Sequence, residues 1–255
     1  MEIFSETLLA GRVVLITGGG SGLGLSMAKR FASLGASVAI TGRKAERLEQ
    51  AAREIGALGE CVALPGDLAR MDEIERIATA FSEREPALHI LVNNAGTSWG
   101  QPIEDYTEAG WDRVMNLNLK APFFLAQRLL PLLRAAGTDE DYARIINLSS
   151  VASTVVGADA AAYGPSKAGL EQLTRIMARA FGDHHIAVNG IAPGWFPSRM
   201  NGPLPDEARE AWRRNTPLKR LGTIEDMGGL AIFLCSRAGA FINGRTIVTD
   251  GGQTL

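Results

Sequence analysis

The chain has 255 residues, 46% of them hydrophobic and 21% charged, so it can bury a full core as one large α/β domain or as two smaller ones. Its formal net charge is -2 and its lysine and arginine residues are scattered, which excludes a strongly basic nucleic-acid-binding protein. No apolar run approaches the roughly 18 residues of a membrane-spanning helix, and the amino terminus is acidic, so we expect a cytoplasmic protein with no membrane partner.

Short β-branched runs alternate with longer amphipathic stretches along the whole chain. Strands that are apolar almost throughout are buried on both faces, and strands separated by helices pair in parallel through right-handed crossovers. We therefore predict a single doubly wound Rossmann domain over residues 1–255, with a parallel seven-stranded sheet and helices on both faces. The predicted strands cover 12–17, 37–41, 61–65, 89–94, 143–149, 186–193 and 244–252, and the predicted helices cover 22–34, 44–57, 70–84, 107–136, 161–182 and 225–236.

A Gly/Pro-rich segment at 193–205 is too short and too apolar for a linker. It is typical of an active-site flap, which we place at about 194–216. The only cysteines, Cys61 and Cys235, lie in apolar stretches, and the three histidines show no ligand spacing. We therefore predict neither a disulfide nor a metal site.

A glycine-rich turn, TGGGSGLG, follows the first predicted strand and opens the first helix. Gly18, Gly22 and Gly24 have no Cβ, so backbone N–H groups and the positive helix end can face a pyrophosphate. Their spacing is G-x-x-x-G-x-G. We predict that this turn, with Ser21 and Leu23, binds the phosphates of a dinucleotide.

The second predicted strand, 37–41, is followed by Gly42, Arg43 and Lys44. An acidic residue here would bind ribose hydroxyls, whereas a guanidinium suits a 2′-phosphate. We therefore predict that NADP(H) is preferred and that NAD(H) remains possible; the alternative is that Arg43 is a surface charge at a helix start. Asp67, after the third strand, has two interpretations, an acceptor for an adenine amino group or a turn cap.

Tyr163 and Lys167 in AAYGPSK are four residues apart where a helix begins. This spacing puts both side chains on one helical face. Pro165 is compatible with the helix because a first-turn N–H has no intrahelical partner. The spacing alone leaves open whether this is a catalytic pair or a solvated surface pair.

A series of short motifs runs along the chain: TGGGSGLG, GDL at 66–68, NNAG at 93–96, LNL at 117–119, NLSS at 147–150, YGPSK at 163–167, PGWFPSRM at 193–200 and DGG at 250–252. In this order the motifs resemble the short-chain dehydrogenase/reductase family from about residue 8 to 255. Within the family, NNAGTSWG, YGPSK and PGWFPSRM together look most like the β-ketoacyl reductase branch, especially its rhamnolipid-type members.

This resemblance implies a catalytic set of Asn118, Ser150, Tyr163 and Lys167. Tyr163 would be the acid/base, and Ser150, thirteen residues before it, would hydrogen-bond the substrate oxygen. The Lys167 ammonium would lower the pKa of Tyr163, and Asn118 would hold a water that links Lys167 to solvent. Asn93 would hold neighbouring strands together, while Thr17 and Asp250 would serve the fold.

The resemblance also implies further contacts to the cofactor. Ser21 stands where many NADP-dependent members carry a basic residue, and Ser198 stands where threonine is usual. The additional cofactor-binding residues would be Leu68, Asn94, Ala95, Gly96, Tyr163, Lys167, Pro193, Gly194, Phe196 and Ser198.

Trp99 and Trp195, with Phe196, predict an apolar substrate entrance next to Ser150, although aromatic residues at a flap can also pack beneath it. We expect an NADP-dependent reductase of a hydrophobic 3-oxo (3-oxoacyl-type) compound. The alternatives are an NAD(P)-dependent secondary alcohol, steroid or sugar/polyol dehydrogenase, or a non-catalytic nucleotide sensor.

The resemblance implies a homotetramer built through the helices at 107–136 and 161–182 and through the segment 236–255. No cluster of basic residues marks a site for an acyl carrier protein. Isolated candidates for such a contact are Arg128, Arg134 and Arg199.

Overall fold

A computed structural model describes residues 5, 7–157, 160–196 and 205–255. Within these residues, seven strands form one parallel sheet, as predicted, and their order is β3-β2-β1-β4-β5-β6-β7. The strand order reverses between β1 and β4, and in doubly wound sheets ligands bind at such a point, beyond the carboxyl ends of the strands. The strands are β1 Val13–Thr17, β2 Ser37–Gly42, β3 Cys61–Pro65, β4 Ile90–Asn93, β5 Ala143–Leu148, β6 Ile186–Pro193 and β7 Thr246–Thr249.

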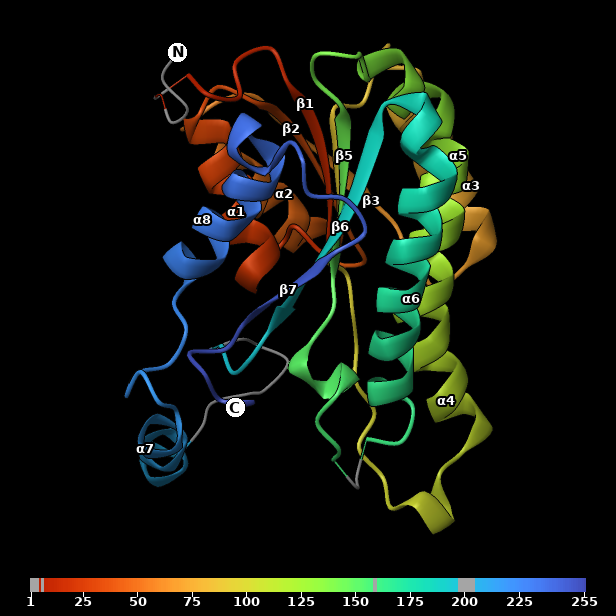
Figure 1. The fold of residues 1–255 in the computed structure, drawn as a ribbon. Helices are drawn as coiled ribbons and strands as arrows, with labels where there is room; N and C mark the ends of the chain where they lie inside the picture. The colour runs from red at the N-terminus through yellow and green to blue at the C-terminus, as the bar shows by residue number, and fades with distance from the viewer. Residues whose placement is uncertain (1–4, 6, 158–159, 197–204) are drawn as a thin grey trace.

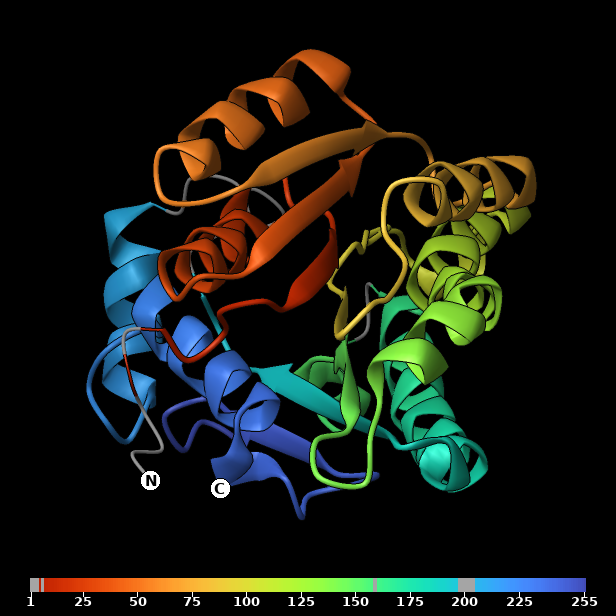
Figure 2. The same ribbon diagram turned by 90° about the horizontal axis from the view of Figure 1, so that it is seen from above.

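Helices cover both faces of the sheet (Figures 1 and 2). Helices α1, α2 and α8 lie on one face, and α3, α5 and α6 lie on the other. Helices α4 and α7 lie near the carboxyl ends of the strands, at the bottom of Figure 1. The helices are α1 Gly22–Ser33, α2 Ala45–Gly56, α3 Met71–Ser82, α4 Glu108–Met115, α5 Ala121–Ala136, α6 Tyr163–Phe181, α7 Asp206–Asn215 and α8 Ile224–Cys235.

The core consists of two apolar clusters, one on each face of the sheet. Successive strand residues point to opposite faces, so Val14 and Ile16 pack under α1 whereas Leu15 packs under the other helical layer. All three side chains are fully buried. The continuous apolar strands of the sequence are therefore explained by helices on both faces.

Two segments differ from the predicted elements. The predicted helix at 107–136 is interrupted by a π-helical turn over Asn116–Lys120, which separates α4 from α5. The predicted flap contains α7 (Asp206–Asn215), and residues 197–204 lie outside the described part of the chain.

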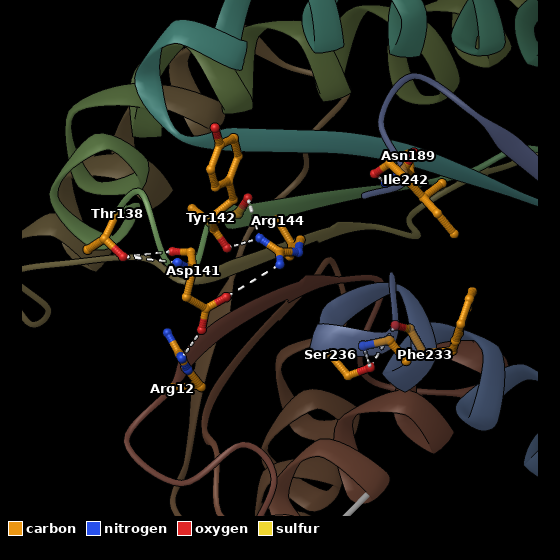
Figure 3. Close-up of polar contacts among 11 residues, drawn as sticks. Arg12, Thr138, Asp141, Tyr142, Arg144, Asn189, Phe233, Ser236 and Ile242 are labelled. Carbon is orange, nitrogen blue, oxygen red and sulfur yellow. Dashed lines mark hydrogen bonds and ion pairs between the residues drawn. The ribbon is translucent and has the colours of Figure 1, made fainter. Parts of the chain in front are cut away.

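A cluster of charges lies at the amino ends of the central strands (Figure 3). Asp141, just before β5, forms ion pairs with Arg12, just before β1, and with Arg144 in β5. The Arg144 side chain is only 3% exposed. Since β4 lies between β1 and β5, these contacts connect the loop before β5 to the start of a strand two positions away.

Candidate active site

A cavity of about 730 Å³ lies at the carboxyl ends of the strands and collects most of the predicted site residues. Gly24, Asn118 and Trp99 are not among the described residues that line it, and Ser198 lies outside the described part of the chain. The predicted residues that line the cavity are Gly18, Ser21, Gly22, Leu23, Arg43, Lys44, Asp67, Leu68, Asn94, Ala95, Gly96, Ser150, Tyr163, Lys167, Pro193, Gly194, Trp195 and Phe196.

The glycine-rich turn forms one wall of the cavity at the start of α1. Gly22 has a φ of +55°, a left-handed conformation that favours glycine. A Cβ at Gly24 would lie 2.5 Å from both Asn94 Nδ2 and the Gly18 oxygen, so Gly24 is needed for close packing behind the turn. Asn94 Nδ2 in turn donates a hydrogen bond of 2.8 Å to the Thr17 oxygen. Asn94 therefore fixes the turn to the end of β4, besides lining the cavity.

Basic side chains line the cavity beyond the end of β2. Arg43 and Lys44 are both exposed there, and Arg47 from the first turn of α2 joins them. Asp67 also lines the cavity, while its Oδ1 accepts a hydrogen bond from the Ala69 N–H at 3.1 Å, as a turn residue would. The three cations make this end of the cavity suitable for an anion.

Tyr163 begins α6 and faces the cavity together with Ser150. Burial raises the pKa of the Tyr163 phenol above its ordinary value of 10.0, and a hydrogen bond with the Ser150 side chain opposes this rise. Desolvation of the phenolate thus outweighs the contact with Ser150. The lowering of this pKa that we expect from the Lys167 ammonium stays a prediction.

Lys167 lies one helical turn after Tyr163, and its side chain is almost completely buried. Its Nζ lies 5.7 Å from the centre of the Tyr163 ring and donates a 2.7 Å hydrogen bond to the Leu148 oxygen. Burial lowers the pKa of Lys167 to about 8, so it is mostly an ammonium at pH 7.

Asn118 lies in the π-helical turn and is fully buried behind the cavity. Its Oδ1 accepts from the Thr97 N–H at 2.8 Å, and its Nδ2 donates to the Thr97 oxygen at 2.9 Å and to Ser166 Oγ at 3.0 Å. A Cβ at Gly96 would lie 3.4 Å from Asn118 Oδ1 and 3.5 Å from Lys167 Nζ. Gly96 therefore lies beside both side chains without filling the space between them.

The aromatic residues separate into two groups. Trp195 lines the cavity and stacks on Trp212 of α7, with ring centres 6.3 Å apart. Phe196 lines the cavity as well but is 4% exposed, so it also belongs to the core. Trp99 packs instead against α4, where a Cβ at Gly110 would lie 2.5 Å from its indole.

Two kinds of feature are absent from the described part of the chain. Within those residues no three acidic, histidine or cysteine side chains are grouped so that they could hold a metal ion. None of the helices there has the length and apolar character needed to cross a membrane.

Known proteins match this arrangement over the whole chain. A family model described as Enoyl-(Acyl carrier protein) reductase matches residues 18–254. This chain belongs to the short-chain dehydrogenase/reductase family of oxidoreductases.

Two curated relatives in this family show different activities. A rhamnolipids biosynthesis 3-oxoacyl-[acyl-carrier-protein] reductase from Pseudomonas aeruginosa is 46% identical over 97% of this chain and 98% of its own length. Gluconate 5-dehydrogenase from Gluconobacter oxydans is 34% identical over 100% of this chain and 98% of its own length. A solved structure described as a Pseudomonas aeruginosa RhlG/NADP active-site complex aligns over 100% of both chains with a TM-score of 0.93 and 45% identity.

Several cavity-lining residues were not predicted from the short-chain dehydrogenase/reductase motifs. Arg47 follows Arg43 by one helical turn, a spacing that the sequence already contains. Some of the others come from segments that only the fold brings to the cavity, among them Arg113 of α4, Trp212 of α7 and Gln253 near the carboxyl terminus.

Proposed function

We propose that this protein is an NADP(H)-dependent reductase that converts a hydrophobic 3-oxo, 3-oxoacyl-type compound to its secondary alcohol. The proposal is supported by the 46% identity to a 3-oxoacyl reductase and by the apolar Trp195–Trp212 wall of the cavity. We expect it to act in the cytoplasm, since Cys61 and Cys235 are free thiols.

The residues of the cavity fit NADP(H). The glycine turn would hold the pyrophosphate with backbone N–H groups at the start of α1. Arg43, Lys44 and Arg47 would hold the 2′-phosphate, and Ala95 and Gly96 leave room beside the catalytic group. The relative structure described as a complex with NADP supports this choice. When bound, the nicotinamide supplies the hydride.

The proposed acid is Tyr163, which would donate its phenolic proton to the carbonyl oxygen of the substrate. Ser150 would donate a hydrogen bond to the same oxygen and hold it in place. Lys167 would stabilise the phenolate that forms, and its ammonium would return a proton to Tyr163. Asn118 would hold the π-helical turn against Thr97, in the loop after β4, and against Ser166 of α6. We propose for it also the relay role that the family implies.

The observation that carries the proposal is the convergence of Ser150, Tyr163 and Lys167 on one wall of a cavity whose other end is basic. A tyrosine with an ordinary pKa of about 10 carries its phenolic proton at neutral pH, so Tyr163 would have a proton to donate in the direction of reduction.

A substrate panel tests the function. Purified protein would be assayed with NADPH and NADH against a 3-oxoacyl thioester, a cyclic ketone and a keto sugar acid, and with NADP⁺ against sorbitol. We expect the highest kcat/KM for the thioester with NADPH. A higher kcat/KM for the sugar acid or polyol would overturn the 3-oxoacyl assignment.

The second candidate is a sugar-acid or polyol dehydrogenase. It is favoured by the 34% identity to gluconate 5-dehydrogenase over the full chain. The same catalytic residues would serve either substrate. The substrate panel therefore shows which of the two substrates the cavity wall accepts, and does not distinguish two reaction mechanisms.

A further inference from the structure

Arg113 is a cation of the cavity wall to which the proposed reaction gives no role. It is carried by α4, and Leu117, one helical turn later, also lines the cavity. The Arg113 guanidinium lies over the ring of Trp99, with 5.2 Å between its central carbon and the ring centre. This is the geometry of a cation–π contact.

Trp99 is held as a fixed platform under Arg113. Its Nε1 donates a 2.9 Å hydrogen bond to Gln101 Oε1, and its backbone oxygen accepts one of 3.1 Å from Tyr106 Oη. The indole lies directly on the backbone of α4, since a Cβ at Gly110 would overlap it. A guanidinium stacked on a ring uses its face and leaves the N–H groups at its edge available.

Arg113 lacks an acidic partner within the part of the chain that the structure describes. No ion pair or hydrogen bond joins it to another described side chain, although it contacts the Trp99 ring. Several other arginines pair with carboxylates: Arg70 with Asp72, Arg76 with Glu73, Arg128 with Glu75, Arg213 with Glu210 and Arg220 with Asp226. The donors of Arg113 are thus free for an anion in the cavity.

Arg113 and the basic group at the end of β2 come from opposite parts of the fold. Arg43, Lys44 and Arg47 come from β2 and α2, beside the glycine turn. Arg113 comes from α4, which packs against the helix that carries Tyr163. Trp99, on which Arg113 stacks, lies two positions after Thr97, and Thr97 is hydrogen-bonded to Asn118. Arg113 therefore belongs to the catalytic side of the cavity.

We infer that Arg113 recognises an anionic group of the substrate, a phosphate or a carboxylate, away from the carbonyl that is reduced. The inference rests on the proposed function and narrows its substrate class. In a thioester this group is the phosphate of a phosphopantetheine arm, and in a sugar acid it is the carboxylate. Trp99 is the positioning residue that orients the guanidinium.

Paired ligands that differ only in the anion test this inference. Calorimetric titration of the NADP⁺-saturated protein would compare 4′-phosphopantetheine with pantetheine, and gluconate with sorbitol. Reduction of the 3-oxoacyl thioesters of 4′-phosphopantetheine and of pantetheine would give a matching ratio of kcat/KM. The pair for which wild type shows a preference identifies the anion as phosphate or carboxylate.

We expect Arg113→Gln to reduce the preference for the anionic member by about 10- to 100-fold, the loss of one charge-assisted contact. Arg113→Lys should keep part of it, and Trp99→Leu should lower it with the charge still present. The control is Arg53→Gln, which changes an exposed arginine of α2 and should keep the wild-type ratio. The affinity for NADP⁺ would be measured for every variant.

The inference is overturned if wild type prefers no anion, if Arg113→Gln keeps the preference, or if Arg113→Gln weakens NADP⁺ binding by the same factor. The last result would assign Arg113 to the cofactor. If no thioester is reduced but the binding preference exists and is lost in Arg113→Gln, the proposed function fails and the inference stands.

Discussion

Tyr163 is the residue at which burial and hydrogen bonding oppose each other. Burial raises the pKa of its phenol, the Ser150 contact lowers it, and burial prevails. The neighbouring Lys167 ammonium is bonded to the Leu148 oxygen rather than to the phenol. The residue pair is thus an acid with a nearby cation, not a preformed phenolate.

Removal of the phenolic hydroxyl in Tyr163→Phe should lower kcat by about 10²- to 10⁴-fold, because only the transferable proton is lost. The Kd for NADP⁺ should stay within about twofold of wild type. Steady-state kinetics and a fluorescence titration would measure both. Tyr142→Phe, which alters a tyrosine just before β5 at the amino ends of the strands, should leave both unchanged. Near-normal turnover by Tyr163→Phe would refute the assignment of the acid.

Lys167 carries a cost in stability that depends on pH. Its pKa is about 8 in the folded protein, below the ordinary value of 10.5, so between these values the unfolded chain binds more protons. Stability therefore rises with pH across this window, and the burial penalty is complete below about pH 8.

Lys167→Met should remove this dependence. We expect the free energy of unfolding of the variant, relative to wild type, to be about 2 to 3 kcal/mol more favourable at pH 7 than at pH 10. Urea unfolding at the two pH values would measure it, with Lys120→Met on an exposed lysine as the control. An equal difference at both pH values would contradict the lowered pKa.

Arg43 should decide the choice of cofactor. Arg43→Ala removes a charge-assisted contact to the 2′-phosphate and should weaken NADP⁺ binding by about 1.5 to 3 kcal/mol while NAD⁺ binding changes little. Titration of both nucleotides against Arg43→Ala and the control Arg53→Ala would measure this. Equal effects on the two nucleotides would mean that Arg43 does not contact the phosphate.

At the scale of elements, the π-helical turn at Asn116–Lys120 shows what a sequence pattern leaves out. The apolar periodicity of 107–136 predicts a helix correctly. A π-helical turn inserted in that helix changes the direction in which the side chains point, but it leaves no mark in the amino-acid composition. The turn places Asn118 against Thr97 and Ser166, contacts that join three separate segments. The identity of Asn118 came from a motif, whereas its environment required the fold.

The charge cluster at the amino ends of the strands should control stability and not catalysis. Asp141→Asn leaves Arg144 buried and poorly compensated, and burial already lowers the pKa of that guanidinium. We expect a loss of about 2 to 4 kcal/mol in the free energy of unfolding. Chemical denaturation would measure it, with the exposed Asp139→Asn as control.

A second variant separates the ion pair from other effects of the substitution. Asp141→Asn combined with Arg144→Met should recover part of the loss, since no unpaired buried charge remains. If the double variant is as unstable as the sum of the single variants, the ion pair is not the cause.

At the scale of the whole molecule, the topology and the cofactor side of the cavity followed from local patterns. The glycine turn, each apolar strand and Arg43 can each be recognised from a few consecutive residues of the sequence. Arg113, Trp212 and Gln253 reach the cavity from separate segments, and no local spacing connects them. Trp99 was predicted on the substrate side because its type fits an apolar wall, but packing on Gly110 directs it against α4.

We propose a homotetramer, on account of apolar side chains left exposed on two surfaces. Phe123 of α5 and Ile176 of α6 are 38% and 54% exposed, on helices that lie side by side (Figures 1 and 2). Near the carboxyl terminus, Phe241 and Leu255 are fully exposed and Val248 of β7 is 53% exposed. We infer that partner subunits cover these exposed side chains.

Sedimentation velocity at micromolar concentration should give a tetramer, and Phe123→Asp with Ile176→Asp should give smaller species. Leu58→Asp, at an exposed leucine beyond α2, is the matched control and should not change the mass. A wild-type monomer would refute the assembly.

The separation of the charge cluster from the cavity has a consequence for how this protein can diversify. Asp141 and its two arginines join strands at the amino ends, while the cavity lies at the carboxyl ends, so the length of the sheet separates the two. We expect that substitutions around Arg113 and Trp212 can change the substrate that is accepted without disturbing the ion pairs of Asp141 at the amino ends of the strands. When substrate specificity changes in evolution, we expect the substitutions to occur at the carboxyl ends of the strands. Stabilising substitutions at the amino ends could then offset the stability that is lost.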